Sequence, residues 1–410
     1  MKDDVIVIGG GAAGLCAAVA VKQQAPGLSV RLLEALPRVG KKLSVTGNGR
    51  CNITNRTVTT ASYHGRRPEF ASYALDRFDN TVCEAFFARL GLPFVYEGEK
   101  AYPASLQAAS VTDCLRFALE ELGVMVCTET RVTNIQLSGG GYKVIAGKVS
   151  FFADRVIVAA GLLSGGEAYG CTGDILALLK KSGFAVVPTH PAIVQVKTAT
   201  DVVRQLKGIK VNANVSLFAG ERLLRREFGE TLFCDYGLSG PPVLQVSGAV
   251  AETDAPKHIE LDLMPRTDLS ALQADLTARA ALLSHRRLEE FFTGMLQKRL
   301  GQVVLKCAGL SLSDKGSSLH EAEIARIAHT LKHFRFAVTG TTGFANSQVT
   351  AGGLDTAGFD PNTMMSRQSP GLYAIGEILD IDGDCGGFNL RWAWSSALCA
   401  TADIVRSATC

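Results

Sequence analysis

Three glycines near the start of the chain constrain its fold more than any other feature. Residues 4–8 read DVIVI, a β-branched run that is typical of a buried parallel strand. The spacing Gly9-x-Gly11-x-x-Gly14 follows, at the start of a segment that is typical of a helix. In such a turn Gly9 permits the tight bend, Gly11 lets a pyrophosphate approach the backbone, and Gly14 lets helix and strand pack closely. The helix start then presents free N–H groups to the phosphates.

The next segment supports a unit that binds a dinucleotide. Pro26-Gly27 ends the helix, and SVRLLE (29–34) is typical of a second strand that finishes in an acid, Glu34. A carboxylate at this point can accept hydrogen bonds from both ribose hydroxyls, and it disfavours NADP because a 2′-phosphate would meet a negative charge. The pattern therefore predicts a Rossmann-like unit, and it leaves NAD and FAD both open.

Length and composition limit the classes of protein to which the chain can belong. The 410 residues have room for two or three domains at about 150 residues each. Hydrophobic residues make up 47% and charged residues 20%, which is ordinary for a globular protein and excludes a disordered or fibrous chain. The formal net charge is +3, so we expect a small-molecule substrate and neither nucleic acid nor membrane as a main partner. Composition does not indicate an oligomeric state.

Cysteine usage and the apolar N-terminal run indicate the compartment. Three consecutive glycines interrupt the apolar residues 5–21, and MKDD precedes the run, so we expect a buried strand and helix instead of a signal peptide or anchor. The 11 cysteines are odd in number and form no C-x-x-C, and the seven histidines are scattered. We therefore expect free thiols, a cytoplasmic location and no metal site.

Two polar, glycine-rich segments at opposite ends of the chain favour FAD over NAD. Residues 40–55, GKKLSVTGNGRCNITN, carry three cations directly after the nucleotide-binding unit, which favours a loop along a pyrophosphate over a solvated loop. Near the other end, residues 371–380 are typical of a strand, followed by a glycine-rich turn and an apolar helix. A purely structural turn is the alternative. An enzyme that binds NAD does not need this C-terminal strand, turn and helix, whereas an enzyme that binds a longer cofactor across the domain does.

With these motifs the sequence resembles the HI0933-like flavoproteins. The matching segments run from residue 4 to about residue 400 and are DVIVIGGGAAGL, GKKLSVTGNGRCNITN, AGLLSGGEAYGCTGDILAL, LFCDYGLSGPPVLQVS, VTAGGL and GLYAIGEILDIDGDCGGFNLRWAWSSA. The resemblance implies non-covalent FAD in a discontinuous, Rossmann-like α/β domain that carries an inserted β-barrel-like domain and an inserted helical domain. We expect the FAD-binding domain at residues 1–190 and 335–410, the β-rich domain at 191–265 and the helical domain at 266–334.

Matched motif by motif, the resemblance also implies which residues contact FAD. These are Gly9, Gly11, Ala12, Ala13, Gly14, Glu34, Lys41, Lys42, Gly47, Gly49, Arg50, Cys51, Asn52, Val132, Ala160, Gly161, Gly376, Glu377, Asn389 and Leu390. The segment after Gly161 departs from the family, which usually has a second glycine and a Ser-Tyr-Pro-like run there. We therefore carry over no contacts from residues 162–169.

The resemblance further implies an oxidoreductase, and three functions stay open. Members are linked to NAD(P)H-dependent reduction of unsaturated 3-oxo bile-acid intermediates and to oxidation of small amino-ketones. The leading hypothesis is reduction of a C=C bond conjugated to a ketone. A flavin amine oxidase that uses dioxygen and a non-catalytic redox sensor are the alternatives, and a nucleic-acid-modifying flavoprotein is disfavoured by the near-neutral charge. No second glycine fingerprint is found, so NAD(P)H would bind transiently over the flavin.

Reduction of a conjugated C=C bond requires a proton donor, which the sequence does not identify. A hydride adds to the β-carbon, a donor binds the carbonyl oxygen, and an acid protonates the α-carbon. Arg50 and Tyr236 are weak candidates for these catalytic roles, while structural roles are favoured for Cys51 and His190.

Overall fold

The computed structural model describes residues 2–408 and divides the chain into two compact units. The first unit is built from both ends of the chain, Met1–Pro191 and Phe344–Cys410, and the second unit, Ala192–Gly343, is inserted between them. Residues 1, 409 and 410, which the predicted domain boundaries include, lie outside the described residues. The predicted α/β class, a discontinuous Rossmann-like domain with an inserted barrel and helices, is confirmed.

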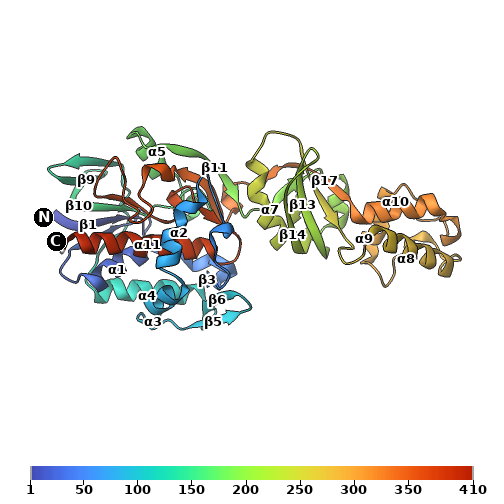
Figure 1. The fold of residues 1–410 in the computed structure, drawn as a ribbon, viewed down its shortest axis with the longest axis horizontal. Helices are drawn as coiled ribbons and strands as arrows, with labels where there is room; N and C mark the ends of the chain where they lie inside the picture. Colours follow the sequence, from blue (N-terminus) through green and yellow to red (C-terminus); the bar gives the residue numbers. More distant parts are fainter. Residues whose placement is uncertain (1, 409–410) are drawn as a thin grey trace. The chain divides into compact units, whose positions relative to one another are not determined.

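A mostly parallel sheet forms the centre of the first unit (Figure 1). Its parallel strands are β1 (Lys2–Ile8), β2 (Val30–Leu33), β7 (Met125–Cys127), β10 (Val149–Val158) and β19 (Leu372–Ala374). The order runs β7-β2-β1-β10, and β19 pairs with the end of β10. Val5–Ile8 of β1, Val156–Val158 of β10 and all of β19 are buried, as is typical of parallel strands that are covered on both faces. The C-terminal strand β19 therefore lies in the same sheet as the N-terminal strand β1.

Antiparallel strands extend the sheet beyond β10. β8 (Asn134–Ser138) and β9 (Gly141–Ala146) form a hairpin, and β9 pairs with the first half of β10. The second half of β10 pairs with β19 from Val156 to Val158. One long strand thus joins the hairpin to the parallel core.

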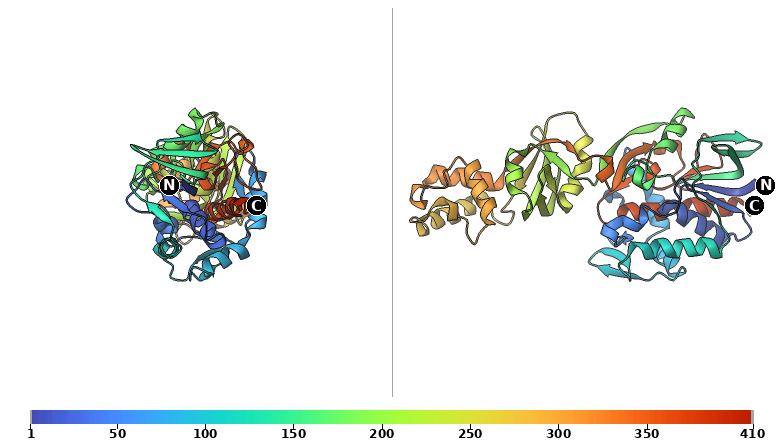
Figure 2. Two further views of the ribbon diagram at one scale, coloured as in Figure 1. Left: turned by 90° about the vertical axis from the view of Figure 1, so that its left-hand side faces the viewer. Right: turned by 180° about the vertical axis from the view of Figure 1, so that it is seen from behind.

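Helices α1 (Ala12–Gln24) and α11 (Phe388–Ala408) bring the two chain ends together. α1 is buried from Ala13 to Val21, because α11 and α4 (Ala108–Glu121) pack against it. Figures 1 and 2 show α1 and α11 close together from both sides of the molecule. The core of this unit is one continuous cluster that includes residues from both helices.

Shorter elements complete the first unit. Three small sheets form, β3-β6-β5, β11-β18 and β20-β4. The helices are α2 (Ser72–Arg77), α3 (Asn80–Ala88) and α5 (Asp174–Lys181), a 3-10 segment η1 spans Leu43–Gly49, and another, η11, spans Gly376–Ile378. The strands are β3 (Thr54–Asn55), β4 (Tyr63–His64), β5 (Phe94–Glu97), β6 (Lys100–Pro103), β11 (Val186–Ala192), β18 (Val349–Leu354) and β20 (Asp382–Gly383).

The second unit combines a closed six-stranded barrel with helices. Around the barrel the strands are β12 (Val196–Thr198), β15 (Gly237–Ser239), β14 (Arg222–Phe233), β13 (Lys210–Ala219), β16 (Lys257–Asp262) and β17 (Phe334–Thr341). The helices are α6 (Thr200–Val203), α7 (Pro241–Val246), α8 (Leu269–Leu282), α9 (Lys298–Cys307) and α10 (Glu321–Lys332). A single core cluster includes barrel and helix residues alike, so the two predicted inserted domains share one core.

The return to the first unit occurs later than the sequence predicts. The predicted boundary at residue 335 falls within β17, which pairs with β16 and β12 and closes the barrel. Phe334 and Phe336 point into the barrel core, where Phe336 contacts Phe233 at a centroid distance of 5.9 Å. A strand pattern in the sequence does not reveal which sheet the strand joins.

Two further findings concern the described residues as a group. The ten cysteines among residues 2–408 are all free thiols. Between those same limits, no helix is both long enough and apolar enough to cross a membrane.

We expect the first unit to fold without the second, because each has its own hydrophobic core. The insertion begins and ends on neighbouring strands, since Val196 is opposite Thr341 and the N–H of Thr342 donates to Gln195 O at 3.1 Å. A chain in which a short Gly-Ser linker replaces residues 195–342 should therefore retain mixed α/β circular dichroism. It should also unfold cooperatively in urea. A non-cooperative urea transition would show that the first unit depends on the insertion.

Candidate cofactor and active site

The predicted motifs meet at the carboxyl edge of the parallel sheet. Residues Gly9–Gly14 follow β1, Glu34 follows β2, Ala160-Gly161 follows β10, and Gly376-Glu377 follows β19. Ligands of open α/β sheets bind outside the carboxyl ends of the strands. Motifs from both ends of the sequence therefore face the same part of the molecule.

The three fingerprint glycines have different surroundings. A Cβ on Gly14 would lie 1.9 Å from Gly9 O, and a Cβ on Gly9, whose φ is +103°, would lie 2.6 Å from Ala159 O. A Cβ on Gly11 would have no protein atom within 4 Å. Packing therefore requires glycine at two positions, and at Gly11 the absence of a side chain leaves open space above the backbone.

This open space adjoins the uncapped start of α1. The helix begins at Ala12, with Ala13 in its first turn, and no side chain caps it or places an acid in that turn. Uncapped N–H groups and the positive end of the helix dipole favour an anion at this point. The turn therefore fits the pyrophosphate of a dinucleotide.

Glu34 is held rigidly at the end of β2. Its Oε2 accepts the N–H of Gly10 at 2.7 Å, and its Oε1 accepts the N–H of Leu36 at 2.8 Å. Each carboxylate oxygen keeps a further lone pair, which leaves Glu34 able to accept ribose hydroxyls. The segment that leads to the buried Val132 runs alongside, because the N–H of Thr130 donates to Glu34 O at 2.8 Å.

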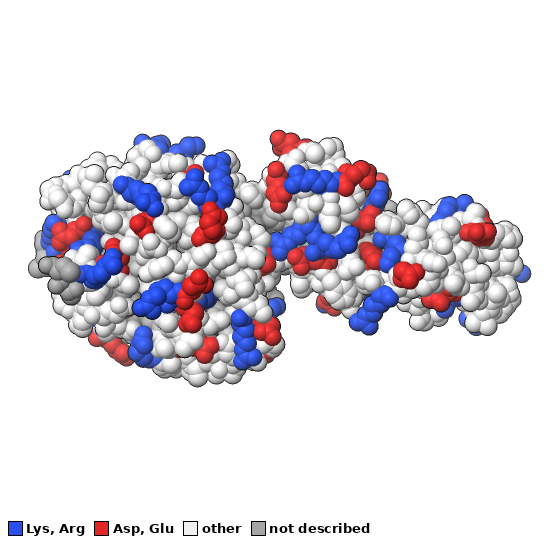
Figure 3. Space-filling view, in the orientation of Figure 1, with Lys and Arg blue, Asp and Glu red and all other residues white. Residues whose placement is uncertain are grey.

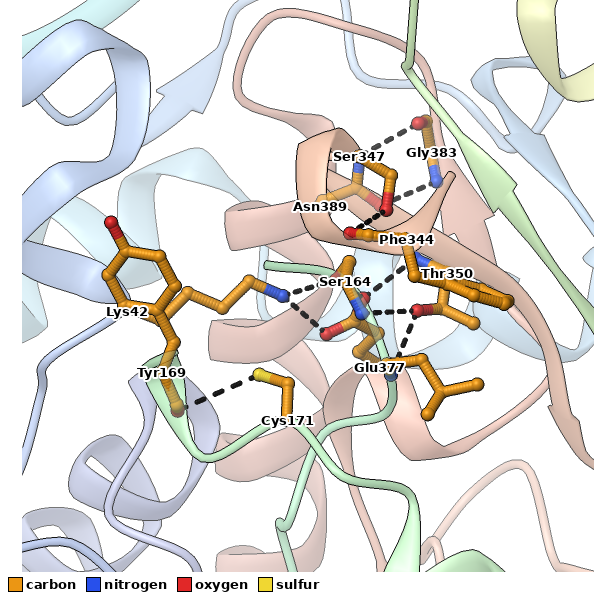
Figure 4. Close-up of polar contacts among 11 residues, drawn as sticks. Lys42, Ser164, Tyr169, Cys171, Phe344, Ser347, Thr350, Glu377, Gly383 and Asn389 are labelled. Atoms are coloured by element: carbon orange, nitrogen blue, oxygen red, sulfur yellow. Dashed lines mark hydrogen bonds and ion pairs between the residues drawn. The ribbon is translucent and has the colours of Figure 1, made fainter. Parts of the chain in front are cut away.

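Lys42 and Glu377 form the charged centre of the site (Figure 4). Lys42 Nζ donates to Glu377 Oε2 at 3.0 Å and to Ser164 Oγ at 2.5 Å. The Oγ–H of Ser164 and the N–H of Thr350 donate to Glu377 Oε1 at 2.5 and 2.8 Å. Burial by itself would lower the pKa of Lys42, but the attraction and hydrogen bond of Glu377 outweigh it and raise that pKa. Lys42 is therefore a cation at neutral pH.

The sequence prediction includes Lys42 and Glu377 but misses Ser164 and Thr350. Ser164 lies in the segment from which we carried over no contacts, yet it is fully buried. Thr350 belongs to the VTAGGL segment of β18, and its Oγ1 accepts the N–H groups of Leu163 and Ser164 at 3.1 and 2.9 Å. The VTAGGL match was a signal that could have pointed to Thr350. Gly161 joins this group, because a Cβ there would lie 3.5 Å from Glu377 Oε2.

The loop of residues 40–55, which carries Lys41, Lys42 and Arg50, has two parts. Lys41 and Lys42 precede η1, and the backbone turns left-handed at Gly47 and Gly49. The Arg50 guanidinium pairs with Glu97 and lies 4.4 Å from the centroid of the Tyr102 ring.

Cys51 and Asn52 complete the loop. Cys51 is fully buried, and burial raises the pKa of its thiol to about 12, so it is no nucleophile at neutral pH. Asn52 Oδ1 is buried and has no hydrogen-bond partner within the described part of the chain. A buried amide oxygen without a partner is costly, which a bound ligand with N–H or O–H donors would relieve.

Asn389 holds the glycine-rich turn at the start of α11. Its Nδ2–H donates to Gly383 O at 2.7 Å, and its Oδ1 accepts the N–H of Gly383 at 2.8 Å (Figure 4). Gly376 contacts both α11 and the first turn of α1. Trp392 Nε1–H of α11 donates to Gly376 O at 3.1 Å, and a Cβ on Gly376 would lie 3.0 Å from Ala13 Cβ of α1. Leu390 is half-buried against the core.

Two further residues considered in the sequence are Tyr236, a catalytic candidate, and His190, for which a structural role is expected. Tyr236 belongs to the second unit, between β14 and β15, where burial and the neighbouring Cys234 raise its pKa. His190 lies on β11, near Asp380. Among residues 2–408, no group of three or more His, Cys, Asp or Glu side chains could hold a metal ion.

The contrast between Gly11 and Gly14 generates a prediction. Gly11→Ala should leave the free energy of unfolding of the apoprotein unchanged but weaken FAD binding about tenfold or more, which equals ~1.4 kcal/mol. Gly14→Ala should destabilise the apoprotein by about 1–3 kcal/mol because its Cβ meets Gly9 O. Urea unfolding and FAD titration of both variants check this. Equal behaviour of the two variants would contradict it.

The chain is similar to known proteins over nearly its whole length. A family model described as HI0933-like protein Rossmann domain matches residues 3–403. A 3-dehydro-bile acid delta(4,6)-reductase of Clostridium scindens is 35% identical over 397 residues, which cover 96% of this chain and 97% of the relative. A ribosomal RNA dihydrouridine synthase of Haemophilus influenzae is 28% identical over 408 residues, or 98% of each chain.

A solved structure shares the fold. The 3-ketosteroid-delta4-(5alpha)-dehydrogenase from Rhodococcus jostii RHA1 superposes with a TM-score of 0.51 at 16% identity, covering 98% of this chain and 97% of its own. At this identity the likeness concerns the fold alone.

Proposed function

This chain belongs to the HI0933-like family and is an FAD-dependent oxidoreductase, and we propose that it reduces a C=C bond conjugated to a ketone in a cyclic molecule of the steroid or bile-acid type. The observation that carries the proposal is the full-length similarity to the bile-acid reductase, at 35% identity. The site geometry supports the cofactor that this reaction needs.

The residues of the site fit FAD in three places. The Gly11 backbone and the start of α1 would hold the pyrophosphate, and Glu34 would hold the ribose of the adenosine half. Lys42 and Glu377 would bind the middle of the cofactor, where a cation can meet phosphate and a carboxylate can accept ribityl hydroxyls. The start of α11, held by Asn389, would face the flavin ring with N–H groups and the positive helix end.

When bound, FAD supplies the hydride for the β-carbon of the substrate. The protein must then orient the enone, donate a hydrogen bond to its carbonyl oxygen, and provide a proton for the α-carbon. The positive end of α11 would stabilise the negative charge that reduction places on the cofactor ring. We further propose that NAD(P)H is the electron source and binds transiently, since no second glycine fingerprint stands in the sequence.

A uridine base in RNA is the second candidate substrate. The relative named ribosomal RNA dihydrouridine synthase covers 98% of this chain, and its product name also implies reduction of a C=C bond conjugated to a carbonyl. The charge pattern favours a small molecule, because Lys and Arg alternate with Asp and Glu on the face shown in Figure 3 and the net charge is +3.

Anaerobic stopped-flow spectroscopy tests the proposal. NADH or NADPH should bleach the flavin absorption, and a 3-oxo-Δ4 steroid should then restore it faster than a uridine-containing ribosomal RNA transcript does. Dithionite-reduced enzyme provides the control that separates the electron donor from the acceptor.

Other outcomes contradict the proposal in different ways. Failure of both nicotinamides contradicts their role alone, if the dithionite-reduced enzyme still reduces the steroid. Restoration by RNA but not by steroid would establish the second candidate. Anaerobic bleaching by a primary amine, with peroxide release once dioxygen is admitted, would indicate an amine oxidase. No turnover with any donor or acceptor would indicate a redox sensor.

A further inference from the structure

A buried arginine in the first turn of α11 has no acidic partner. Arg391 is 1% exposed, and its backbone N–H donates to Gly387 O at 2.9 Å, directly at the start of the helix. Its guanidinium donates from Nη1 to Cys83 Sγ at 2.7 Å and from Nη2 to Leu75 O at 2.9 Å. Within residues 2–408 its Nε–H has no hydrogen-bond partner and no carboxylate forms an ion pair with it. Arginine side chains are almost never fully buried unless they are paired, so Arg391 is an exception.

Two ionisable groups near Arg391 are neutral. Burial raises the pKa of the Cys83 thiol to about 11, although Arg391 acts in the opposite direction. Burial also raises the pKa of Tyr63, whose Oη–H donates to Phe388 O at 3.0 Å. At neutral pH both groups therefore keep their protons, and neither supplies a negative charge to the guanidinium.

The acids of this region are bound to other groups. Asp79 acts on Cys83 only through its charge, since it is exposed and its Oδ1 accepts the N–H of Val82 at 3.0 Å. Asp384 Oδ1 contacts His64 Nε2 at 2.8 Å. A charge taken out of water costs free energy unless an opposite charge approaches it. The uncompensated charge of Arg391 therefore indicates that a bound ligand supplies the negative charge.

We propose that Arg391 stabilises the negative charge of the reduced flavin and so raises the reduction potential of the bound FAD. This proposal rests on the FAD of the proposed function and on its ring lying at the start of α11, but on no substrate. The first turn of α11 contains no acid, so the positive end of the helix and the guanidinium act in the same direction.

Arg391 does not have to touch the flavin ring for this effect. In a protein interior, opposite unit charges about 10 Å apart still attract each other by more than the thermal energy. The contacts with Leu75 of α2 and Cys83 of α3 fix the guanidinium beside the helix start. Arg391 is therefore a residue that acts through its electric field and not as a catalytic group.

The step that this charge favours is the uptake of a hydride. NAD(P)H, the proposed donor, loses two electrons and one proton together as its C–H bond breaks, and the nicotinamide becomes a cation. FAD gains the same two electrons and proton as a new bond to hydrogen forms, and it gains one negative charge. A cation near the ring lowers the free energy of this reduced state relative to the oxidised one.

A first test compares Arg391→Gln with Arg391→Lys. The midpoint potential of the bound FAD is measured by equilibration with a redox dye. Gln keeps N–H donors for Leu75 O but removes the charge, so reduced FAD should bind at least about tenfold more weakly relative to oxidised FAD, which lowers the two-electron potential by about 30 mV. Lys keeps the charge and should keep the wild-type potential. A wild-type potential in a folded, FAD-loaded Arg391→Gln would contradict the proposal.

A second test leaves Arg391 in place. Cys83→Asp puts a carboxylate where Sγ now accepts a hydrogen bond from Nη1, so the guanidinium gains the acidic partner that it lacks. The potential should then fall as in Arg391→Gln. Cys83→Ser is the matched neutral variant and should keep the wild-type potential. This pair decides the question even if Arg391→Gln does not fold.

Arg31→Gln is the control for loss of a cation elsewhere in the first unit. Arg31 Nε donates to Asp3 Oδ2 at 2.7 Å near the beginning of β1, away from the carboxyl edge, so this variant should keep the wild-type potential. A wild-type potential in Cys83→Asp as well as in Arg391→Gln would overturn this proposal alone. A folded protein that binds no FAD would overturn the proposed function and this proposal with it. Because no substrate is used, failure of the steroid to react would contradict the proposed substrate only.

Discussion

The pairing of β10 with β1 on one side and with β19 on the other is the constraint on which the rest of the structure depends. Three parallel strands in register end at the same edge, so the loops after Ile8, Val158 and Ala374 must converge. Helices α1 and α11 follow the outer strands and pack on each other, which buries the small residues of α1. A cofactor-binding site made from residues far apart in the sequence is the direct consequence.

Charge is balanced in opposite ways at two carboxyl groups of this site. Glu377 accepts hydrogen bonds from Lys42, Ser164 and Thr350, so its charge is compensated where a cofactor would lie along it. Asp382 is 5% exposed, and burial, with the charges of neighbouring acids, raises its pKa. The two carboxyl groups therefore differ in how far the protein compensates a negative charge on them.

Most of the fold could be predicted from local patterns in the sequence. The strand–glycine–helix pattern at residues 4–25 and the resemblance based on GRCNITN and GGFNLRWAWSSA led to the correct family and class, because they encode local turns. The boundary at residue 335 was placed too early, since a strand pattern does not say which sheet it joins. Ser164 escaped prediction because its importance comes from Glu377, a neighbour distant in sequence.

The central claim is that both ends of the chain together bind one FAD, and the absorption spectrum of the purified protein tests it most directly. The account predicts a yellow protein with one flavin per chain, released intact by denaturation because the binding is non-covalent. A correctly folded protein that is colourless and stays colourless after incubation with excess FAD would contradict the claim.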